Sequence, residues 1–594
     1  MVEIAKFEFT EGGIEEIGQN NVYNQKWPIV YIIHNEAEAY VGETVDAKGR
    51  MANHFSNPDR SNLKHLKLIF DAEFNKSATL DIESFLIKYM ASDGKYILQN
   101  GNMGLVSHDY FQKEKYKIKF DELWDLLIAK NLAKNQLAQI DNSDLFKYSP
   151  YKTLTEDQFR TIAGVLTDII AGLNGNKSNI PLIIEGGAGT GKTVLAIFLM
   201  KLLRTEIKEE DYLEKLDDMS GNMDILKKLE QIKSKRTLEI GLVIPMTSLR
   251  KTIKQVFRFV SGLKPSMVLG PGDVAKKRYD VLIVDEAHRL STRGRYGIIA
   301  KTNRKLGLNE KTGTQLDWIL KQSTFQVLFY DSGQSIKPAD VKAERFDNLV
   351  GKAKRYTLTS QLRVKDKDYI GYVDTILESS CKQKKIFANY EFKLFEKIKD
   401  MVEEIKEKDE KYGLSRMIAG FGWEWKTQGG KPGYDFRIED VDFRWNSTTE
   451  DWVNSPNAAK EVGCIHTTQG YDLNYAGVIL GPEVSYDKQR HTIIVDRKKY
   501  FDRNGKPNAV YDKGDKQLLT YIKNIYRTLM SRGISGTYVY ACDASLREYL
   551  KKWITENKVI RINQQYDTQR KEGYLAAGED LKLQRAAEKE PEKK

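Results

Sequence analysis

The clearest chemical pattern of the sequence lies near its middle, in the stretch IIEGGAGTGKTV at residues 183–194. Its glycines, lysine and threonine have the spacing GxxxxGK[ST] between an apolar run and a helical pattern, which is typical of a phosphate-binding loop. Such glycines let backbone N–H groups converge on phosphates, the lysine reaches the terminal phosphates and the threonine hydroxyl binds magnesium. We therefore predict a nucleotide site made of Gly186, Gly187, Ala188, Gly189, Thr190, Gly191, Lys192 and Thr193.

A second stretch, VLIVDEAHRL, ends an apolar strand pattern with two adjacent carboxylates, Asp285 and Glu286. The first acid at such a strand end can hold magnesium together with Thr193, and the second can polarise an attacking water. Adjacent carboxylates could also be merely solvated, but after a phosphate-binding loop they indicate catalysis. Together the two motifs predict hydrolysis of a nucleoside triphosphate, with ATP and Mg²⁺ as cofactors.

The elements that must position these residues form an α/β pattern. The apolar runs PLIIEGG, IGLVIP, VLIVDEA, FQVLFYD and GVILGPE alternate with helical stretches. Buried strands that alternate with helices predict parallel sheets covered on both faces.

Between residues 154 and 540, the order of motifs resembles that of superfamily 1 helicases. The resemblance implies that Gln158 in LTEDQFR contacts adenine, and that Thr247 and Ser248 in IPMTSLRKT grip a nucleic-acid strand. Asp331 and Gln334 in YDSGQ match the family's sensor of the terminal phosphate. The stretch SRMIAGFGWEWKT and the long insertion before YRTLMSRG look most like the Schlafen-type bacterial branch of these ATPases.

The second half of the chain continues the resemblance. LTSQLRV supplies Arg363, and YRTLMSRGISG supplies Arg527 and Arg532, of which Arg532 best matches the arginine that reaches the transferring phosphate across an inter-domain cleft. Thr468 in IHTTQGYDL matches a nucleic-acid contact of the family. The same motif also contains Gln469, Gly470 and Asp472. The implied fold is two RecA-like P-loop lobes with inserted subdomains, and ATP binding between the lobes implies translocation along nucleic acid.

Near the N-terminus, IVYIIHNEAEAYVGET contains two short strand patterns, with Tyr31 in the first and Tyr40 in the second. Two tyrosines on a hairpin are by themselves an ordinary structural feature. Arg50 follows Tyr40 by ten residues, and His54 lies one helical turn further on the same face. With Glu83 on a later helix pattern, this order resembles the GIY-YIG endonucleases, although Ile29 replaces the first glycine of their motif.

The resemblance implies metal-dependent cleavage of a phosphodiester by this region. Glu83 would hold a single Mg²⁺ or Mn²⁺ ion, and Tyr31 would take the proton of the attacking water with the help of His54. Arg50 and Tyr40 would stabilise the charge that develops on the phosphate. The family also has a late asparagine, which either Asn100 or Asn102 could provide.

Size and composition limit the alternatives. At 594 residues the chain is long enough for two to four domains, and lysine and arginine exceed aspartate and glutamate by 94 − 83 = 11, which weakly favours a polyanionic partner. Three widely spaced cysteines support neither a disulfide framework nor a zinc cluster. No apolar run is long enough to span a membrane and the N-terminus does not look like a signal peptide, so we expect a cytoplasmic protein.

The expected domains follow from these patterns. They are a GIY-YIG nuclease domain at 1–110, a helical connector at 111–147, a first RecA-like lobe at 148–345 with a charged, protruding helical insertion at 205–236, a second lobe at 346–568 with an insertion at 383–460, and a disordered charged tail at 569–594. Trp423, Trp425 and Trp445 could form a base-stacking surface, but aromatic residues in such subdomains are more often core.

The sequence therefore predicts an ATP-driven DNA motor coupled to an endonuclease, in defence against foreign DNA, restriction or DNA repair. The expected partner is DNA with single-stranded regions, and RNA is not excluded. Two alternatives remain open: an ATP-switched regulator that binds nucleic acid without cutting it, and an RNA-processing nuclease–helicase.

Overall fold

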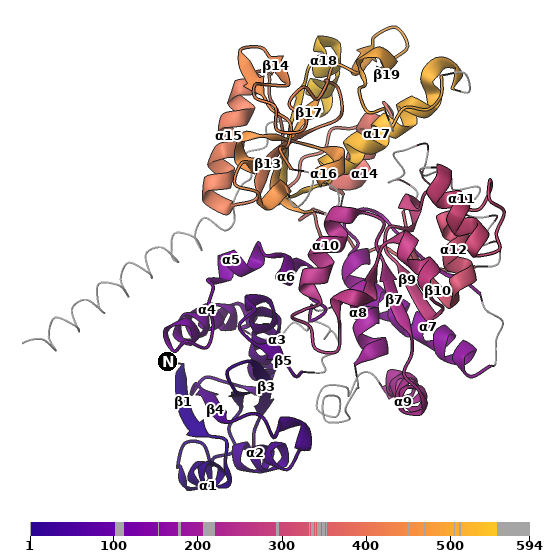
Figure 1. Ribbon diagram of the computed structural model, residues 1–594. Coiled ribbons are helices and arrows are strands. Elements are labelled where there is room, and N and C mark those ends of the chain that lie inside the picture. Colours follow the sequence, from indigo (N-terminus) through magenta and orange to yellow (C-terminus); the bar gives the residue numbers. More distant parts are fainter. Residues whose placement is uncertain are drawn as a thin grey trace, which may run out of the picture.

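A computed structural model describes most of the chain. The described residues are 2–100, 112–152, 154–175, 180–205, 220–292, 296–331, 333, 338, 340, 346, 348, 351, 353–366, 368–448, 452–468, 471–503, 505–509 and 512–554. Figure 1 shows three parts stacked along the molecule: an N-terminal α/β unit in indigo, a central unit around one parallel sheet, and a third unit around another.

The N-terminal unit is built on a five-stranded sheet of order β1-β4-β2-β3-β5. Strands β2 and β3 form the antiparallel hairpin, in which Tyr31 lies opposite Gly42 and Ile33 opposite Tyr40. The elements are β1 (Glu3–Glu8), α1 (Glu11–Gln19), β2 (Ile29–His34), β3 (Glu38–Thr44), α2 (Ala47–Phe55), η1 (Pro58–Arg60), β4 (His65–Phe70), α3 (Lys76–Asp93) and β5 (Ile97–Leu98).

Side chains alternate between the two faces of this sheet, as strand geometry requires. Val30, Ile32 and Val41 belong to the hydrophobic cluster that includes α3, whereas Tyr31 and Tyr40 belong to the cluster that includes α1 and α2. The two tyrosines therefore face α2, which carries Arg50 and His54, and α3 covers the opposite face.

The central unit contains a six-stranded, wholly parallel sheet of order β11-β6-β10-β9-β7-β8. Its strands are β6 (Leu182–Gly186), β7 (Ile240–Val243), β8 (Val268–Leu269), β9 (Tyr279–Val284), β10 (Ser323–Tyr330) and β11 (Lys354–Leu358). Alternate strand residues pack against α7 (Glu156–Leu173), α8 (Lys192–Arg204) and α10 (Thr247–Val256) on one face and against α12 (Gln315–Gln322) on the other. Shorter elements complete the unit: η3 (Pro265–Met267), η4 (Pro271–Lys276), η5 (Ala287–Arg289) and α11 (Tyr296–Lys305).

The third unit contains a five-stranded parallel sheet of order β12-β20-β17-β13-β16 with its own core. The strands are β12 (Glu391–Leu394), β13 (Ser415–Ala419), β16 (Val462–Cys464), β17 (Leu473–Leu480) and β20 (Gly533–Ala541). Its helices are α14 (Tyr369–Leu377), α15 (Ile398–Tyr412), α16 (Ile465–Thr468), α17 (Lys516–Met530) and α18 (Ala544–Trp553). Two small hairpins, β14 (Phe436–Ile438) with β15 (Val441–Phe443) and β18 (Val484–Asp487) with β19 (Thr492–Val495), project from it, with short turns at η7 (Trp452–Asn454), η8 (Ala458–Lys460), η9 (Arg497–Lys499) and η10 (Lys513–Asp515). The two parallel sheets show the α/β fold that the apolar runs predict.

The structure differs from the expected domain limits in two places. Strand β11 pairs with β6 throughout its length, so the first sheet continues beyond the limit of 345. The expected insertion at 383–460 contains β12 and β13, which pair with β20 and β17 and are therefore part of the second sheet itself. Both differences arise because β11 and β12 are short and mostly exposed or half-buried, so they lack the apolar run by which a sequence reveals a strand.

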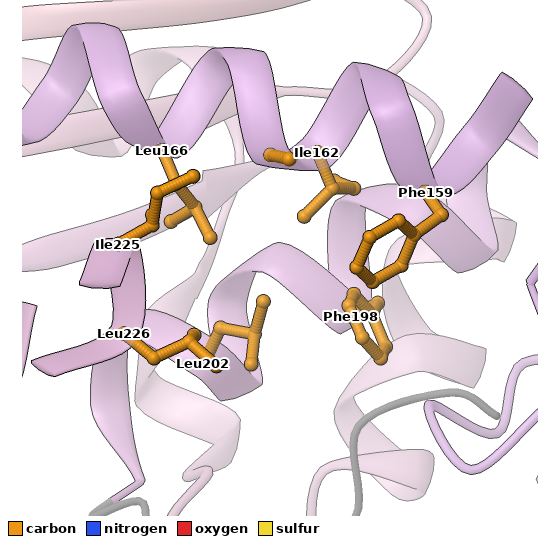
Figure 2. Close-up of a pocket in the computed structure, with 8 residues that line it drawn as sticks. Phe159, Ile162, Leu166, Phe198, Leu202, Ile225 and Leu226 are labelled. Carbon is orange, nitrogen blue, oxygen red and sulfur yellow. The ribbon is translucent and has the colours of Figure 1, made fainter. Parts of the chain in front are cut away.

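The charged insertion at 205–236 also differs from expectation in its described part. Helix α9 (Ser220–Lys235) does not protrude: Leu226, Leu229 and Ile232 are buried in the core. Figure 2 shows the apolar seam in which Leu226 meets side chains of α7 and α8. Residues 206–219 and the tail at 569–594 lie outside the described residues.

The tryptophans favour the core interpretation. Trp445 is fully buried, and the ring of Trp423 stacks on Phe436 at a centroid distance of 4.1 Å. Trp425 packs against the same core and is half-buried.

Helices α4 (Lys113–Ala129), α5 (Leu137–Asp141) and α6 (Asp144–Lys147) connect the N-terminal unit to the rest of the chain. One continuous hydrophobic cluster contains residues of α3, the connector and α8, so the N-terminal and central units share a core. Among the described residues, no helix is both long and apolar enough to cross a bilayer.

Candidate functional site

The glycine-rich loop leads from the end of β6 into α8. Gly189 and Gly191 have φ angles of +84° and +81°, which a residue with a Cβ adopts only under strain. Lys192 begins α8, and its Nζ donates to the carbonyl oxygens of Gly186 at 2.6 Å and Gly187 at 2.8 Å. The ammonium also lies 3.2 Å from a carboxylate oxygen of Asp331 at the end of β10. The lysine is thus held inside the curve of the loop.

The two expected magnesium ligands lie together. The Thr193 hydroxyl donates to a carboxylate oxygen of Asp285 at 2.7 Å. Burial first, and then the charge of Glu286, raise the pKa of Asp285 to about 7. Magnesium in nucleotide sites is commonly bound by one or two side-chain oxygens together with phosphate oxygens. The Thr193–Asp285 pair fits such an ion.

Glu286 follows Asp285 in a left-handed backbone conformation, with φ of 52°. Its carboxylate lies 2.8 Å from Nε2 of His288. Burial alone would raise the pKa of Glu286, but His288 beside it outweighs burial and holds that pKa far below its usual value. Nδ1 of His288 accepts a hydrogen bond from the Asp331 backbone N–H at 3.3 Å, so Nε2 carries the proton that faces Glu286. His288 therefore joins Glu286 to the end of β10.

Residues 359–363 form a strap over the phosphate-binding loop. Gln361 Nε2 donates to the Ala188 carbonyl at 2.7 Å, and the Leu362 N–H donates to the Gly189 carbonyl at 2.9 Å. A Cβ on Gly189 would lie 2.0 Å from Oε1 of Gln361, so this close contact requires glycine. Asp157 at the start of α7 anchors the strap by accepting hydrogen bonds from the backbone of residues 359 and 360.

Two of the expected arginines meet between the parallel sheets. Arg363 forms an ion pair with Asp472. Arg532 is buried, and its Nη1 donates to the Tyr471 carbonyl at 3.2 Å. Burial, followed by the charge of Arg363, lowers the pKa of Arg532 to about 10, while the charges of Asp472 and Glu286 oppose this shift. The structure therefore brings Arg363, Asp472 and Arg532 close to Glu286.

Arg527 has a different environment. Its Nε donates to Asp374 within the third unit, and its Nη1 donates to Asn524 at 3.1 Å. A Cβ built on Gly333, two residues after Asp331, would lie 3.3 Å from the same Nη1, so Arg527 also faces the central unit. Gln334, Gln469 and Gly470 lie outside the described residues.

The expected adenine and strand contacts are placed as follows. Gln158 is buried beside the loop, where its Nε2 donates to the Thr190 carbonyl at 2.9 Å and its Oε1 accepts from the Thr155 N–H. Thr247 is exposed at the start of α10, whereas Ser248 is buried. Thr468 is buried and its hydroxyl donates to the Cys464 carbonyl at 3.0 Å. Of the three expected nucleic-acid contacts, Thr247 is the accessible one.

In the N-terminal unit, Tyr31 is the centre of a polar cluster. Its hydroxyl lies 2.7 Å from Nε2 of His54 and accepts a hydrogen bond from Nε of Arg50 at 3.2 Å. The rings of Tyr31 and Tyr40 are stacked, with centroids 6.3 Å apart, and the His54 ring lies 5.0 Å from that of Tyr40. The structure thus brings together Tyr31, Tyr40, Arg50 and His54.

The direction of these hydrogen bonds follows from Arg60, a buried residue that sequence reasoning missed. Nη1 of Arg60 lies 3.4 Å from Nε2 of His54, and its guanidinium covers the Tyr40 ring at 3.8 Å. A guanidinium can only donate, so Nε2 of His54 is an acceptor. Tyr31 therefore donates its own proton to His54 and accepts one from Arg50.

Glu83 is buried on α3, on the opposite side of the sheet from α2. Burial, and to a smaller extent the charge of Glu83, raise the pKa of Tyr31 well above its usual value even though Arg50 opposes the shift. Tyr31 is therefore a neutral hydroxyl at physiological pH. One carboxylate together with phosphate and water oxygens suits a single Mg²⁺ or Mn²⁺ ion. The role of Glu83 as such a ligand stays a prediction.

The hairpin also explains two positions of its motif. A Cβ on Gly42 would lie 2.2 Å from the Tyr31 hydroxyl, so this glycine is required beneath the ring. Ile29 is 2% exposed and packs in the core, at the position where the motif of the GIY-YIG nucleases has a glycine. Asn100 is buried and pairs with the backbone of Val41 through both ends of its amide, whereas Asn102 lies outside the described residues.

Three residues of these sites were missed by sequence reasoning: Arg60, His288 and Gln361. His288 lies within VLIVDEAHRL and Gln361 within LTSQLRV. Their places in these motifs, beside expected site residues, are the signal that could have identified them. Arg60 follows a proline turn and has no motif of its own.

The chain is similar to known proteins, and its family match lies within the central and third units. The family described as "Schlafen group 3, DNA/RNA helicase domain" matches residues 181–543. An uncharacterized protein of Saccharomyces cerevisiae is 29% identical over 446 residues, which cover 67% of this chain and 90% of the yeast protein. Among solved structures, a Pif1 helicase from Bacteroides in complex with ADP-AlF3 and ssDNA aligns over 72% of this chain and 98% of its own, with 14% identity and a TM-score of 0.26. A Pif1 helicase from Candida albicans aligns over 67% of this chain and 99% of its own, with 12% identity and a TM-score of 0.23.

Proposed function

The chain belongs to the Schlafen group 3 DNA/RNA helicase family, and from this premise we propose that it is an ATP-driven DNA motor whose N-terminal unit is a metal-dependent GIY-YIG endonuclease. The observation that carries the motor is the ion pair of Arg363 with Asp472 beside the buried Arg532, whose pKa responds to the charge of Glu286. The observation that carries the nuclease is the hydrogen-bonded cluster around Tyr31.

For the motor, the chain's own residues divide the work of ATP hydrolysis. Lys192 exchanges the carbonyls of its loop for the terminal phosphates, and Glu286 orients the attacking water. Arg363 leaves Asp472 for the developing charge on the phosphate, assisted by Arg532. Magnesium, held by Thr193 and Asp285, supplies charge neutralisation between the phosphates when bound. The central and third units close around ATP and open after its hydrolysis. This cycle moves the protein along a strand of nucleic acid.

Thr247 is the accessible polar residue that we assign to nucleic-acid binding. The exposed hydroxyl of Thr247 lies at the start of α10, where backbone N–H groups favour phosphate oxygens. Phosphate contacts of this kind make binding fall steeply with salt. Single-stranded DNA is the substrate we propose for the motor.

For the nuclease, the hydrogen-bond direction defines the proton path. Water loses a proton to the Tyr31 oxygen while the Tyr31 hydroxyl proton moves to Nε2 of His54, and the water oxygen forms a bond to phosphorus. The sugar oxygen leaves with the electron pair of the broken P–O bond and takes a proton from solvent. Arg50 stabilises the charge on the phosphate, an effect of about 10²- to 10³-fold for a well-placed donor. The ion held by Glu83 supplies Lewis-acid polarisation of the phosphate when bound.

The motor is tested by ATP hydrolysis with and without single-stranded nucleic acid. Lys192→Ala should abolish hydrolysis, since the Lys192 ammonium is the group bound to the carbonyls of the loop, whereas Lys228→Ala on the exposed face of α9 should not change it. Stimulation by single-stranded DNA is the expected result. Hydrolysis by Lys192→Ala would overturn the nucleotide site, and stimulation by RNA alone would favour the RNA-processing alternative.

The nuclease is tested by cleavage of DNA with Mg²⁺ or Mn²⁺. Glu83→Ala should lose cleavage, while Asp81→Ala, which removes a carboxylate two residues earlier on the same helix, should keep it. Equal cleavage by both variants would rule out Glu83 as the metal ligand. DNA binding without cleavage by the wild type would favour the ATP-switched regulator.

A motor and a cutter in one chain suit the destruction of foreign DNA, so we propose defence as the role, with restriction or repair as the other settings of the same activity. A plasmid or phage challenge of cells that carry the wild type or Glu83→Ala would test it. Equal survival of both would contradict a role for cleavage in defence.

A further inference from the structure

One lysine of the phosphate-loop helix reaches into the N-terminal unit. Lys201 lies nine residues after Lys192 on α8, and only 2% of its surface is exposed. Its Nζ donates to the Asn100 carbonyl at 3.2 Å and lies 3.6 Å from the centroid of the Tyr151 ring. The Lys201 ammonium of the central unit thus contacts the N-terminal unit just after β5.

Asn100 connects Lys201 to β3, the strand that carries Tyr40, because its side chain binds the backbone of Val41. Its side-chain oxygen accepts from the Val41 N–H at 3.1 Å, and its side-chain nitrogen donates to the Val41 carbonyl at 2.7 Å. Val41 lies between Tyr40 and Gly42, and the Tyr31 ring rests on Gly42. Asn100 and Val41 are therefore the two residues that lie between α8, the helix after the phosphate-binding loop, and the tyrosine cluster.

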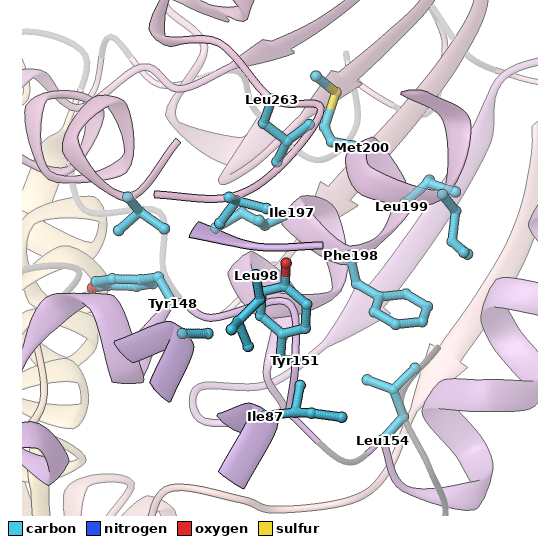
Figure 3. Close-up of a cluster of buried hydrophobic side chains, with 14 of the residues drawn as sticks. Ile87, Leu98, Tyr148, Tyr151, Leu154, Ile197, Phe198, Leu199, Met200 and Leu263 are labelled. Carbon is cyan, nitrogen blue, oxygen red and sulfur yellow. The ribbon is translucent and has the colours of Figure 1, made fainter. Parts of the chain in front are cut away.

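The Tyr151 ring, which the Lys201 ammonium faces, stands among apolar side chains. Figure 3 shows Tyr151 beside Leu98 of β5, with Ile197 of α8 above them and Ile87 of α3 below. Removing an ammonium from water is unfavourable unless hydrogen bonds and an aromatic face compensate. The Asn100 carbonyl and the Tyr151 ring both provide such compensation for the Lys201 ammonium.

We propose that Lys201 is a positioning residue of the nuclease, which fixes strand β3 from the motor's phosphate-loop helix through Asn100. This inference rests on the proposed nuclease function of the N-terminal unit. It makes the geometry around Tyr31 depend on the position of α8. A displacement of about 1 Å at a reacting centre can lower a rate about 10²-fold, so a contact this far from the phosphate can control cleavage.

The test compares three variants of the full chain. Lys201→Met keeps the length of the side chain and removes its donors, and Lys201→Arg restores a cation. Lys233→Met is the matched control, because Lys233 also caps carbonyls at the end of α8, those of Leu202 and Thr205, but from α9. Each variant is measured for ATP hydrolysis, for kcat and KM of DNA cleavage, and for hydrogen exchange of the backbone amides of β3.

For Lys201→Met we expect kcat of cleavage to fall about 10-fold or more, because a looser β3 displaces Tyr40 and Gly42 from their places beside Tyr31. KM for DNA and the ATPase rate should stay within about twofold, because Lys201 is buried and therefore closed to either substrate. The Val41 amide should exchange about 10-fold faster. Lys201→Arg should recover most of the loss, and Lys233→Met should leave cleavage and β3 exchange unchanged.

Wild-type cleavage and unchanged β3 exchange in Lys201→Met would overturn the positioning role while leaving the nuclease function intact. A wild type that does not cleave DNA would instead refute the nuclease function. In that case the exchange of β3 still decides whether Lys201 holds the strand. An equal rise of exchange in every element would show general destabilisation and would contradict a specific role.

Discussion

At the scale of single residues, Gly42 is the position on which the tyrosine cluster most depends. The Tyr31 ring occupies the space that a Cβ on residue 42 would need, and Tyr31 is fully buried. Because the ring is packed on all sides, it cannot move away without disturbing His54 and Arg50. A methyl group at this position therefore acts on the geometry of the whole cluster.

Gly42→Ala should lower DNA cleavage about 100-fold, because it displaces Tyr31 from His54. Overpacking at such a site lowers the free energy of unfolding by about 1–3 kcal/mol, so the N-terminal unit should also melt at a lower temperature. Gly12→Ala is the control, since a Cβ there lies 4.0 Å from its nearest neighbour, the Thr10 hydroxyl. Cleavage at the wild-type rate by Gly42→Ala would contradict the role given to Tyr31.

Glu483 in the third unit gives a prediction about pH. It is buried after β17, where it accepts a hydrogen bond from Tyr526. Burial raises the pKa of Glu483 to about 7 in spite of this hydrogen bond. The unfolded chain ionises Glu483 near pH 4.5, so stability falls as pH rises from about 4.5 to about 7 and changes little above that.

Glu483→Gln removes this titration. Relative to the variant, the wild type should therefore lose stability on going from pH 5 to pH 8, by an amount on the order of 3 kcal/mol. Melting temperatures of both proteins at pH 5, 6, 7 and 8 measure the difference. A difference that is constant with pH would show that Glu483 is already ionised in the folded protein at pH 5.

Residues differ in how far the sequence alone reveals them. Lys192, Asp285 and Arg363 stand in motifs whose order carries the helicase resemblance, which the family match confirms. The assignment of the N-terminal unit to the GIY-YIG nucleases remains a prediction. Arg60 and Lys201 could not be predicted, because each acts through a neighbour distant in sequence: Arg60 covers Tyr40, and Lys201 contacts Asn100.

At the scale of elements, the strap at 359–363 links the two parallel sheets across the nucleotide site. Its hydrogen bonds to Ala188 and Gly189 hold Arg363 beside the loop, and Asp157 holds its other end. Four hydrogen bonds from the side chains and backbone around Asp157 keep its pKa well below the usual value, against the effect of burial. The strap is therefore anchored by an ionised carboxylate.

Asp157→Ala should free the strap and raise KM for ATP about 10-fold, because Gln361 and Arg363 would no longer be held over the loop. Glu156→Ala is the matched control: the adjacent carboxylate is exposed and pairs with Arg160 on the surface. ATPase kinetics of the two variants measure the effect. An unchanged KM in Asp157→Ala would show that the strap does not contribute to nucleotide binding.

Elements were also easier or harder to predict for physical reasons. The long apolar runs of β6, β9, β10 and β17 are buried on both faces and are visible in the sequence. Strand β11, with the sequence KRYTL, lies at the edge of the sheet, and most of its residues are exposed or half-buried. Because its sequence is charged and has no apolar run, it could not be recognised as a strand. The leucines of α9 can be read from the sequence, but the sequence does not show that they pack against α7 and α8.

At the scale of the whole molecule, the connector touches all three units. Asp141 of α5 accepts a hydrogen bond from Tyr89 of α3, the helix that carries Glu83. From the other side, Lys147 of α6 donates to the carbonyl of Asp472, the ion-pair partner of Arg363. If Arg363 moves toward ATP, its partner Asp472 is released, and this changes the contact of Lys147 with Asp472. The connector that carries Lys147 also contacts α3 through Asp141. This arrangement supports coupling between the ATP site and the N-terminal unit.

Cleavage of a defined DNA with and without ATP tests the coupling of motor and nuclease most directly. With Mg²⁺ present, we predict that ATP increases wild-type cleavage about 10-fold or more, the size of a typical coupling free energy between sites. Lys192→Ala should lose this stimulation and keep the slower cleavage seen without ATP. Equal cleavage with and without ATP, in the wild type as in Lys192→Ala, would contradict a nuclease coupled to the motor.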